Sequence, residues 1–367
     1  MADKQLSVAF IGAGIMGAPI AGHILDAGYP LTVHSRTKSK AESLLERGAM
    51  WADSPAEAAK DADVVFTMVG YPNEVEEIYL AGDGLLASAK KGATLIDLTT
   101  SSPELARDIA EAAEVSGLHA FDCPVTGGES GAIAGTLTGI VGATEHDIEP
   151  VRAVLETFTG RLFCFGGAGK GQAAKLSNQV ALASSMVGYA DALSFAQQNG
   201  LDLGQVRDMI LTGTGASGAM QTLAPKSMDG DYKPGFMVEH FLKDLGLALQ
   251  VAEEKEIALP GADTAFTLYD MLEAIGGAKL GTQAITLLYQ EEADAVAAGL
   301  DWSLYTQAHE DEECGCGCGH DHEHGDHECC GGHHHEDGHE CCHGEGHGHH
   351  HGDGHECCCG GHGHHAE

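Results

Sequence analysis

Short apolar runs alternate with stretches of helical periodicity along the first half of the chain. A strand-like run of residues 7–11 begins this pattern. Further strand-like runs cover residues 31–34, 63–69, 94–98, 119–122, 137–141 and 161–165. Residues 37–47 are predicted to form a helix, and Ser102 and Pro103 supply a cap and a first-turn proline for another. Strands that alternate with helices are typical of a parallel, doubly wound sheet, so we predict an α/β domain over residues 1–168.

The pattern changes to helix alone after residue 168. Apolar side chains recur at helical spacing over residues 171–199 without a proline. Asn178, Gln179 and Asp191 interrupt this stretch, which favours an interdomain or dimer-core helix over a membrane span. Residues 202–211, 241–255, 264–275 and 282–298 also read as helices. We therefore predict an all-α domain over residues 169–303, with a role in substrate binding and dimerisation.

Composition changes abruptly after Trp302, where Gly, His, Cys, Asp and Glu replace nearly all apolar residues. Such a segment cannot offset the entropy cost of ordering without a ligand. We expect residues 304–367 to form a low-complexity tail that is disordered when metal-free. The tail from residue 310 carries fifteen Asp and Glu and no Lys or Arg, which leaves −21 of the net charge of −36 on the rest. This charge disfavours nucleic-acid and anionic-membrane partners.

The glycines that follow the first strand carry the most specific local signal. Gly12, Gly14 and Gly17 stand in GxGxxG register between a strand and a helix. The first permits a tight turn, the second lets a pyrophosphate approach the backbone, and the third lets helix and strand pack closely. The motif predicts a Rossmann-type dinucleotide-binding domain. Its cofactor-binding residues would be Gly12, Ala13, Gly14, Ile15, Met16 and Gly17, with Met68 and Val69 at the end of the 63–69 strand.

Cofactor choice depends on the end of the second strand. An Asp or Glu there would accept a hydrogen bond from the ribose 2′-hydroxyl of NAD. The chain instead has Ser35, Arg36 and Thr37 after His34. Arg36 can stack on adenine and pair with a 2′-phosphate, helped by the two hydroxyls. We therefore expect NADP to be preferred over NAD, the alternative being that Arg36 is only a solvated surface residue.

Three further motifs follow the glycine motif in a recognisable order. They are CPVTGG at residues 123–128, GKGQAAKLSNQ at 169–179 and KDLGLAL at 243–249. Together with GxGxxG they resemble the β-hydroxyacid dehydrogenase family over about residues 5–300. That family includes 3-hydroxyisobutyrate dehydrogenases and semialdehyde reductases such as 2-hydroxy-3-oxopropionate (tartronate semialdehyde) reductase. The resemblance implies an NAD(P)-dependent oxidoreductase that interconverts a short β-hydroxyacid and its semialdehyde.

The resemblance implies that Lys175 is the catalytic acid and base. Hydride transfer to an aldehyde leaves an alkoxide, and an ammonium beside that oxygen supplies both charge and proton. A lone helix lysine is usually a solvated surface charge. The family has an asparagine four residues after this lysine, whereas this chain has Gln179 there and Asn178 one position earlier. Both amides share a helix face with Lys175, so either could hydrogen-bond the substrate.

The resemblance also implies the remaining substrate and cofactor contacts. Thr126, Gly127 and Gly128 form a candidate carboxylate cradle, although a simple glycine-rich turn would look alike. Phe236 and His240 are candidates for the wall of the substrate pocket, while His240 could equally be a structural helix residue. The remaining cofactor-binding residues would be Thr100 against the nicotinamide ribose and the Lys243–Asp244 pair.

The tail suggests a separate chemistry. After His309 it holds ten of the twelve cysteines and seventeen histidines, with HECC repeated three times. This density suits Zn, Ni or Cu in several interchangeable sites, because no fixed CxxC…CxxC frame is present. The candidate ligands are Cys314, Cys316, Cys318, His320, His322, His324, His327, Cys329, Cys330, His333, His339, Cys341, Cys342, His355, Cys357 and Cys358. A solubilising tail that binds metal only adventitiously is the alternative.

These observations favour a cytoplasmic enzyme, expected to be a homodimer or homotetramer, with no catalytic metal. The leader-free start of the sequence and its few body cysteines support that compartment. Cys123 and Cys164 are most simply small hydrophobes. A metal-buffering or metal-delivery protein carried on an enzyme-like body is the alternative function. An imine reductase is disfavoured because relatives of that kind replace the lysine, and a 6-phosphogluconate dehydrogenase would need a longer helical domain.

Overall fold

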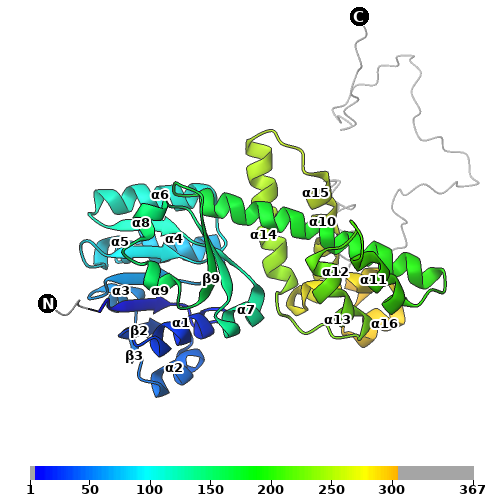
Figure 1. The fold of residues 1–367 in the computed structure, drawn as a ribbon, viewed down its shortest axis with the longest axis horizontal. Coiled ribbons are helices and arrows are strands. Elements are labelled where there is room, and N and C mark those ends of the chain that lie inside the picture. Colours follow the sequence, from blue (N-terminus) through cyan, green and yellow to red (C-terminus); the bar gives the residue numbers. More distant parts are fainter. Residues whose placement is uncertain (1–4, 305–367) are drawn as a thin grey trace, which may run out of the picture. The chain divides into compact units, whose positions relative to one another are not determined.

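A six-stranded parallel sheet organises the first half of the computed structural model, which describes residues 5–304 (Figure 1). The strand order is β3-β2-β1-β4-β5-β6, so the chain reverses its direction of travel across the sheet at β1 and β4. Such a switch point opens a ligand-binding crevice at the carboxyl ends of the strands. The strands are β1 (Val8–Ile11), β2 (Leu31–His34), β3 (Met50–Trp51), β4 (Val64–Thr67), β5 (Thr94–Asp97) and β6 (His119–Asp122).

The register aligns the carboxyl ends of these strands. Ile11 pairs with His34 on one side and with Thr67 on the other. Thr67 in turn pairs with Asp97, and Asp97 pairs with Asp122. The loops that follow β1, β2, β4, β5 and β6 therefore leave the sheet along one edge. This edge carries the candidate cofactor residues.

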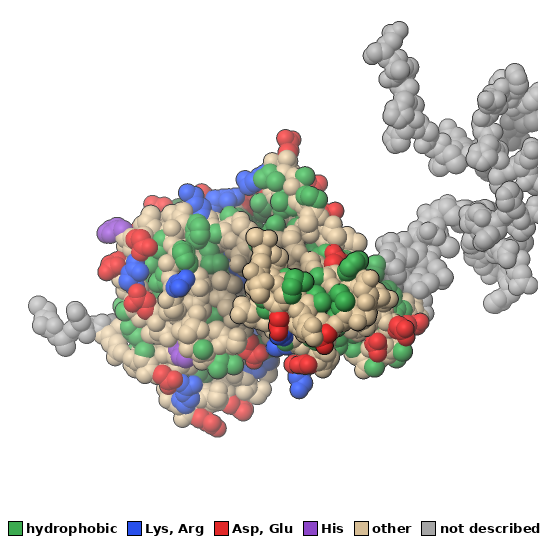
Figure 2. Space-filling view, turned by 45° about the vertical axis from the view of Figure 1, so that its right-hand side comes forward, with side chains coloured by type: hydrophobic (Ala, Val, Ile, Leu, Met, Phe, Trp, Pro, Cys, Tyr) green, Lys and Arg blue, Asp and Glu red, His purple; other side chains and the backbone are tan. Residues whose placement is uncertain are grey.

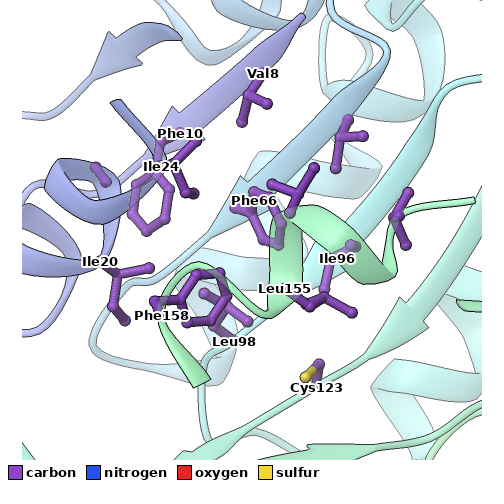
Figure 3. Packing of buried hydrophobic residues seen from close by; sticks show 14 of the residues in the cluster. Val8, Phe10, Ile20, Ile24, Phe66, Ile96, Leu98, Cys123, Leu155 and Phe158 are labelled. Carbon is purple, nitrogen blue, oxygen red and sulfur yellow. The ribbon is translucent and has the colours of Figure 1, made fainter. Parts of the chain in front are cut away.

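Helices cover both faces of the sheet because the strands bury side chains on both sides. Phe10 and Phe66 stack at 6.0 Å between ring centroids, and Phe158 meets Phe66 edge-on at 5.8 Å (Figure 3). Ile20 and Ile24 of α1 join this cluster. Ala9 and Ile11 belong to the opposite cluster. The helical segments of this half are α1 (Gly17–Asp26), η1 (Lys38–Ala41), α2 (Glu42–Glu46), α3 (Pro55–Ala59), α4 (Pro72–Leu80), α5 (Leu85–Ser88) and α6 (Pro103–Val115).

A second sheet follows the first one. Its strands are β7 (Val125–Thr126), β8 (Leu137–Val141) and β9 (Thr159–Cys164), with β7–β8 antiparallel and β8–β9 parallel. Two of the strand-like runs thus form strands outside the six-stranded sheet, because strand periodicity does not specify a partner. Cys123 is buried and Cys164 is partly buried. The helices here are α7 (Gly128–Ala134), α8 (Glu145–Ile148) and α9 (Arg152–Leu155).

The remainder of the described chain is helical. Its longest element is α10 (Lys170–Gln198), which buries Met186 and Tyr189 in the core of this half. The other elements are α11 (Leu203–Leu211), α12 (Gly218–Thr222), α13 (Ala224–Met228), α14 (Val238–Glu254), α15 (Pro260–Ala274), η2 (Gly277–Lys279), η3 (Thr282–Tyr289) and α16 (Glu292–Ala297). Among residues 5–304, no helix combines the length and the apolar character needed to cross a membrane.

The single helix expected over residues 282–298 is wrong. Thr282–Tyr289 forms a 3₁₀ helix, and α16 begins only at Glu292 after an extended Glu291. The carbonyl of Thr282 accepts a hydrogen bond from Tyr269, at 2.8 Å. The carbonyl of Gln283 accepts one from Ser227, at 2.9 Å. Buried side chains from other helices therefore occupy the carbonyls that a longer α-helix would use.

Candidate active site

The three glycines of the loop between β1 and α1 lie in different surroundings, two crowded by protein atoms and one open. Gly12 has a φ of +103°, and a Cβ there would lie 2.1 Å from the carbonyl oxygen of Met68. A Cβ at Gly17 would lie 1.9 Å from the carbonyl oxygen of Gly12. At Gly14, however, a Cβ would meet no atom of the described chain within 4 Å. The protein's own packing explains Gly12 and Gly17, and Gly14 leaves open space where a pyrophosphate would approach.

Arg36 is the cation at the end of β2, but it already has a partner. Its side chain is 86% exposed, and Nη1 lies 2.7 Å from Oε1 of Glu74 on α4. The other Glu74 oxygen accepts hydrogen bonds from the backbone N–H groups of Gly70 and Tyr71, at 2.8 and 3.1 Å. Neighbouring Ser35 is buried and Thr37 is exposed. Sequence reasoning missed Glu74, because it lies on another element.

The loops after β4 and β5 are held together at the sheet edge. Met68 donates its backbone N–H to Ile11, and Val69 donates to the Thr99 hydroxyl at 3.1 Å. The carbonyl of Thr100 accepts a hydrogen bond from Lys243 Nζ on α14, at 2.6 Å. Burial raises the pKa of nearby Asp97 to about 6, against hydrogen bonds that lower it. Of the candidate cofactor residues in these loops, Thr100 is therefore hydrogen-bonded to α14.

Asp122 fixes the start of α10. Its carboxylate accepts hydrogen bonds from the backbone N–H groups of Gly169 and Gln172, at 2.7 and 2.6 Å. Burial raises its pKa, and these two N–H groups oppose the shift. The Gln172 side chain then bridges to the β5 loop by donating to the Thr99 carbonyl and accepting from Ser101 N–H. Sequence reasoning missed Asp122 and Gln172, although Asp122 stands directly before the CPVTGG motif.

The glycines of GKGQAAK serve packing against protein. Gly169 has a φ of +79°, and a Cβ there would lie 2.3 Å from the Pro103 carbonyl oxygen. A Cβ at Gly171 would lie 2.5 Å from the carbonyl oxygen of Ile140 in β8. Glycine at both positions lets α10 begin in contact with β8 and α6. The same contacts place Lys175 one turn further along α10.

Lys175 is a buried cation without a counter-ion in direct contact. Its side chain is 7% exposed, and within residues 5–304 its ammonium makes no hydrogen bond or ion pair. Burial lowers its pKa below the ordinary 10.5, Asp244 opposes that effect, and Lys243 adds to it. A group of this kind is suited to donate and regain a proton.

The lysine–aspartate pair of α14 lies beside Lys175. Lys243 Nζ is 2.9 Å from one Asp244 oxygen. Gln179 donates to the other Asp244 oxygen at 2.8 Å, and its own oxygen accepts from Asn178 at 2.9 Å. Gln179 is buried and Asn178 is exposed. The Gln179 amide is thus hydrogen-bonded to other protein groups in the described structure. A substrate contact by Gln179 or Asn178 stays a prediction.

The CPVTGG loop adopts a backbone that demands glycine. Gly127 and Gly128 have φ angles of +131° and +63°. A Cβ at Gly128 would meet no described atom within 4 Å, so conformation and not crowding requires glycine there. Thr126 pairs with Thr138 of β8, and β8 also contacts the start of α10. The candidate carboxylate cradle and α10, which carries Lys175, therefore both contact strand β8.

Phe236 and His240 sit in different surroundings. Phe236 packs against Phe241 at 5.5 Å between centroids, at the edge of the helical core. His240 meets Tyr71, from the turn before α4, edge-on at 5.9 Å. Burial lowers the pKa of His240, which favours its neutral form. The contact with Tyr71 gives His240 a packing role, and a role at the pocket wall stays a prediction.

The described surface and interior show no metal centre. No group of three or more His, Cys, Asp or Glu within residues 5–304 could hold a metal ion. All sixteen candidate tail ligands, from Cys314 to Cys358, lie outside the described residues. On the face shown in Figure 2, Lys and Arg side chains are interspersed with Asp and Glu.

Comparison with known proteins agrees with this geometry. The sequence profile described as the NAD-binding domain of 6-phosphogluconate dehydrogenase matches residues 7–166. The profile described as NAD-binding of NADP-dependent 3-hydroxyisobutyrate dehydrogenase matches residues 169–289. The uncharacterized oxidoreductase YkwC of Bacillus subtilis is 45% identical over 77% of this chain and 98% of that protein. The 3-hydroxyisobutyrate dehydrogenase of Pseudomonas aeruginosa is 35% identical over 81% of this chain and 96% of that protein.

Solved structures show the same architecture. Mycobacterium tuberculosis 3-hydroxyisobutyrate dehydrogenase with L-serine has a TM-score of 0.73 at 32% identity, covering 78% of this chain and all of that one. Psf3 in complex with NADP⁺ and 2-OPP has a TM-score of 0.72 at 29% identity, covering 77% of this chain and all of that one. The expected family and fold class are thereby confirmed. The chain belongs to the β-hydroxyacid dehydrogenase family of NAD(P)-dependent oxidoreductases.

Proposed function

We propose that this protein is an NADP-linked oxidoreductase that interconverts a short β-hydroxyacid and its semialdehyde. The observation that carries the proposal is Lys175, a buried ammonium with a lowered pKa and no direct counter-ion. It belongs to a helix whose start is tied to the loops at the sheet edge. Burying a cation without a counter-ion costs folding free energy. Such a group is typical of a functional site, where its lowered pKa suits proton transfer to a substrate oxygen.

The residues present fit a dinucleotide. The space left at Gly14 suits a pyrophosphate, and the loops ending in Val69 and Thr100 lie further along the same sheet edge. Bound nicotinamide supplies or takes up a hydride at the substrate carbon. Lys175 donates its proton to the carbonyl oxygen during reduction, and the resulting neutral amine accepts the hydroxyl proton during oxidation. The ammonium also stabilises negative charge that develops on that oxygen.

The preference for NADP rests on Arg36. No carboxylate follows β2 directly, and the exposed guanidinium keeps its Nε and Nη2 edge available beside the Glu74 contact. The relative Psf3 was solved with NADP⁺, and the second matching profile is described as NADP-dependent. Glu74 holds Arg36 by one nitrogen, which limits where the guanidinium can meet a 2′-phosphate.

The substrate class rests on the glycine loop. The Thr126 hydroxyl and the backbone around Gly127 and Gly128 offer donors for one carboxylate. The relatives include a 3-hydroxyisobutyrate dehydrogenase and a dehydrogenase solved with L-serine. 3-Hydroxyisobutyrate and L-serine are both carboxylic acids that carry a hydroxyl group. We therefore propose a three- or four-carbon substrate with a carboxylate near the reacting carbon.

A substrate panel tests this proposal. Oxidation of 3-hydroxyisobutyrate and L-serine, and reduction of tartronate semialdehyde, glyoxylate and succinic semialdehyde, are followed by NADPH absorbance. Parallel assays with NADH and with Lys175→Ala protein serve as controls. We expect turnover of at least one member with NADPH favoured. Tight NADPH binding without turnover of any member would contradict the proposed reaction.

A second candidate function concerns the tail alone. The number and density of His and Cys after residue 310 favour binding of Zn, Ni or Cu, which would make the protein a metal buffer as well. The two matching profiles cover residues 7–166 and 169–289, so the tail lies outside the matched enzyme body. This proposal rests on the sequence.

A further inference from the structure

Gln179 connects the helix that carries Lys175 to the acidic residue of α14. It lies four residues after Lys175 on the same face of α10, and its side chain is 1% exposed. Its Nε2 donates to Asp244 across 65 residues of sequence, at 2.8 Å. The amide one helical turn after the candidate general acid, that of Gln179, is therefore hydrogen-bonded to the Asp244 carboxylate.

Both oxygens of that carboxylate are occupied. Lys243 Nζ lies 2.9 Å from Oδ1 of Asp244 and also donates to the Thr100 carbonyl, at 2.6 Å. Gln179 holds Oδ2. Asp244 and Lys243 are also the described charged groups whose fields act on Lys175. Lys175 thus feels Asp244 through space without forming an ion pair with it.

Asp244 sets the orientation of the Gln179 amide. An ionised carboxylate can only accept, so Nε2 faces Asp244 and Oε1 accepts from Asn178 at 2.9 Å. A flipped Gln179 amide would place its oxygen against a carboxylate oxygen, which is repulsive. The carboxylate therefore holds one orientation of the amide, and Asn178 completes the network.

We propose that Gln179 is a positioning residue whose amide retains Asp244, so that Asp244 cannot swing into a direct ion pair with Lys175. The inference rests on the proposed function of Lys175 as general acid and base. Without the amide, Oδ2 of Asp244 would be buried and would lack its hydrogen bond, and Lys243 already holds Oδ1. The Lys175 ammonium, on whose charge Asp244 already acts, would then be available as a partner for Oδ2. A direct pair would favour the charged lysine and weaken it as a proton donor.

The pKa of Lys175 measures this role directly. Full-length protein without cofactor is reductively ¹³C-methylated, and the Lys175 resonance is titrated by NMR in wild type and in Gln179→Met. Methionine has a similar volume but cannot donate to Asp244. We expect the Lys175 pKa to rise by about one unit, the lower end of the effect of an opposite charge in contact. Gln198→Met, at an exposed position on the same helix, is the matched control and should leave the titration unchanged.

A second variant covers the case in which Gln179→Met does not fold. Asn178 is exposed, and Asn178→Ala removes its hydrogen bond to the Gln179 amide oxygen. We expect the pKa of Lys175 to rise in this variant too, by less than in Gln179→Met. In kinetics, the high-pH limb of the reduction rate should move upward with the NMR titration. A Lys175 titration like that of wild type in every folded variant would overturn the positioning role. Absence of turnover by wild type would overturn the proposed function instead.

Discussion

The proposed preference for NADP depends on one exposed side chain, Arg36. Its guanidinium contacts Glu74 through one nitrogen and is otherwise solvated. A phosphate carries more charge than a carboxylate and accepts from two nitrogens of the planar guanidinium at once. The 2′-phosphate of NADP can therefore bind the free edge while Glu74 keeps the side chain in place. NAD offers only hydroxyls to the same edge.

Arg36→Asp should reverse this choice. The substitution removes the phosphate partner and supplies an acceptor for ribose hydroxyls, so preference should move toward NADH by about tenfold to a hundredfold. Glu74→Gln is the companion variant, because an amide oxygen still accepts from Gly70 and Tyr71 while the charge is lost. It should retain the NADPH preference. Steady-state kinetics with both cofactors decide the matter, and wild-type protein that favours NADH would contradict the assignment of Arg36.

The pH dependence follows from the lowered pKa of Lys175. In the proposed mechanism reduction requires the ammonium, so its rate should be highest below that pKa and fall as the pH rises through it. Oxidation requires the neutral amine and should show the opposite limb. Because burial lowers the pKa, both limbs should lie below pH 10.5. Rate profiles for kcat in the two directions measure this, and limbs that do not mirror one another would exclude a shared acid–base group.

At the scale of elements, local sterics were predictable and long-range partners were not. The β1–glycine–α1 unit follows from apolar periodicity and from the φ and close contacts that only Gly12 and Gly17 allow. The two-residue β3 gives no periodic signal. The interruption of residues 282–298 depends on Tyr269 and Ser227, which lie on other helices. Gln179 was a substrate-binding candidate, a role that stays a prediction, and the sequence did not indicate its hydrogen-bond acceptor Asp244, which is distant in sequence.

Gly171 tests how tightly the start of α10 is packed. Gly171→Ala would place a Cβ 2.5 Å from the Ile140 carbonyl oxygen and 2.7 Å from an Asp122 oxygen. We expect a loss of about 1–3 kcal/mol of unfolding free energy and a fall in kcat, because α10 must shift. Gly188→Ala on the same helix meets no described atom within 4 Å. This control should be stabilised by about 0.5–1 kcal/mol. Equal stabilities in urea would contradict the packing argument.

At the scale of the whole molecule, the body and the tail differ in whether they contain enough apolar residues to form a core. The body buries apolar clusters in both its α/β half and its helical half. The residues after 310 offer ligand atoms and almost no apolar surface. Relatives matched over their own length fix the family of the body. The boundaries at residues 168 and 303, the oligomeric state and the cytoplasmic location stay predictions from the sequence.

Deleting residues 310–367 should separate the two activities. We expect unchanged reductase kinetics and the loss of high-capacity Zn or Ni binding. Binding to the full chain should weaken as the pH falls, because protons compete for thiolates and imidazoles. Calorimetric titration of both proteins measures the stoichiometry. Equal metal binding by the truncated protein would contradict the tail assignment, and loss of turnover would contradict its independence.

The proposed reaction depends most on Lys175. The decisive measurement compares the single-turnover reduction rate of wild type and Lys175→Ala with the best aldehyde of the panel, at saturating NADPH. Lys170→Ala, an exposed lysine at the start of the same helix, is the control. We predict that Lys175→Ala binds NADPH normally and reduces the aldehyde about two to four orders of magnitude more slowly, while the control does not change. A Lys175→Ala rate within a few-fold of wild type would contradict the account.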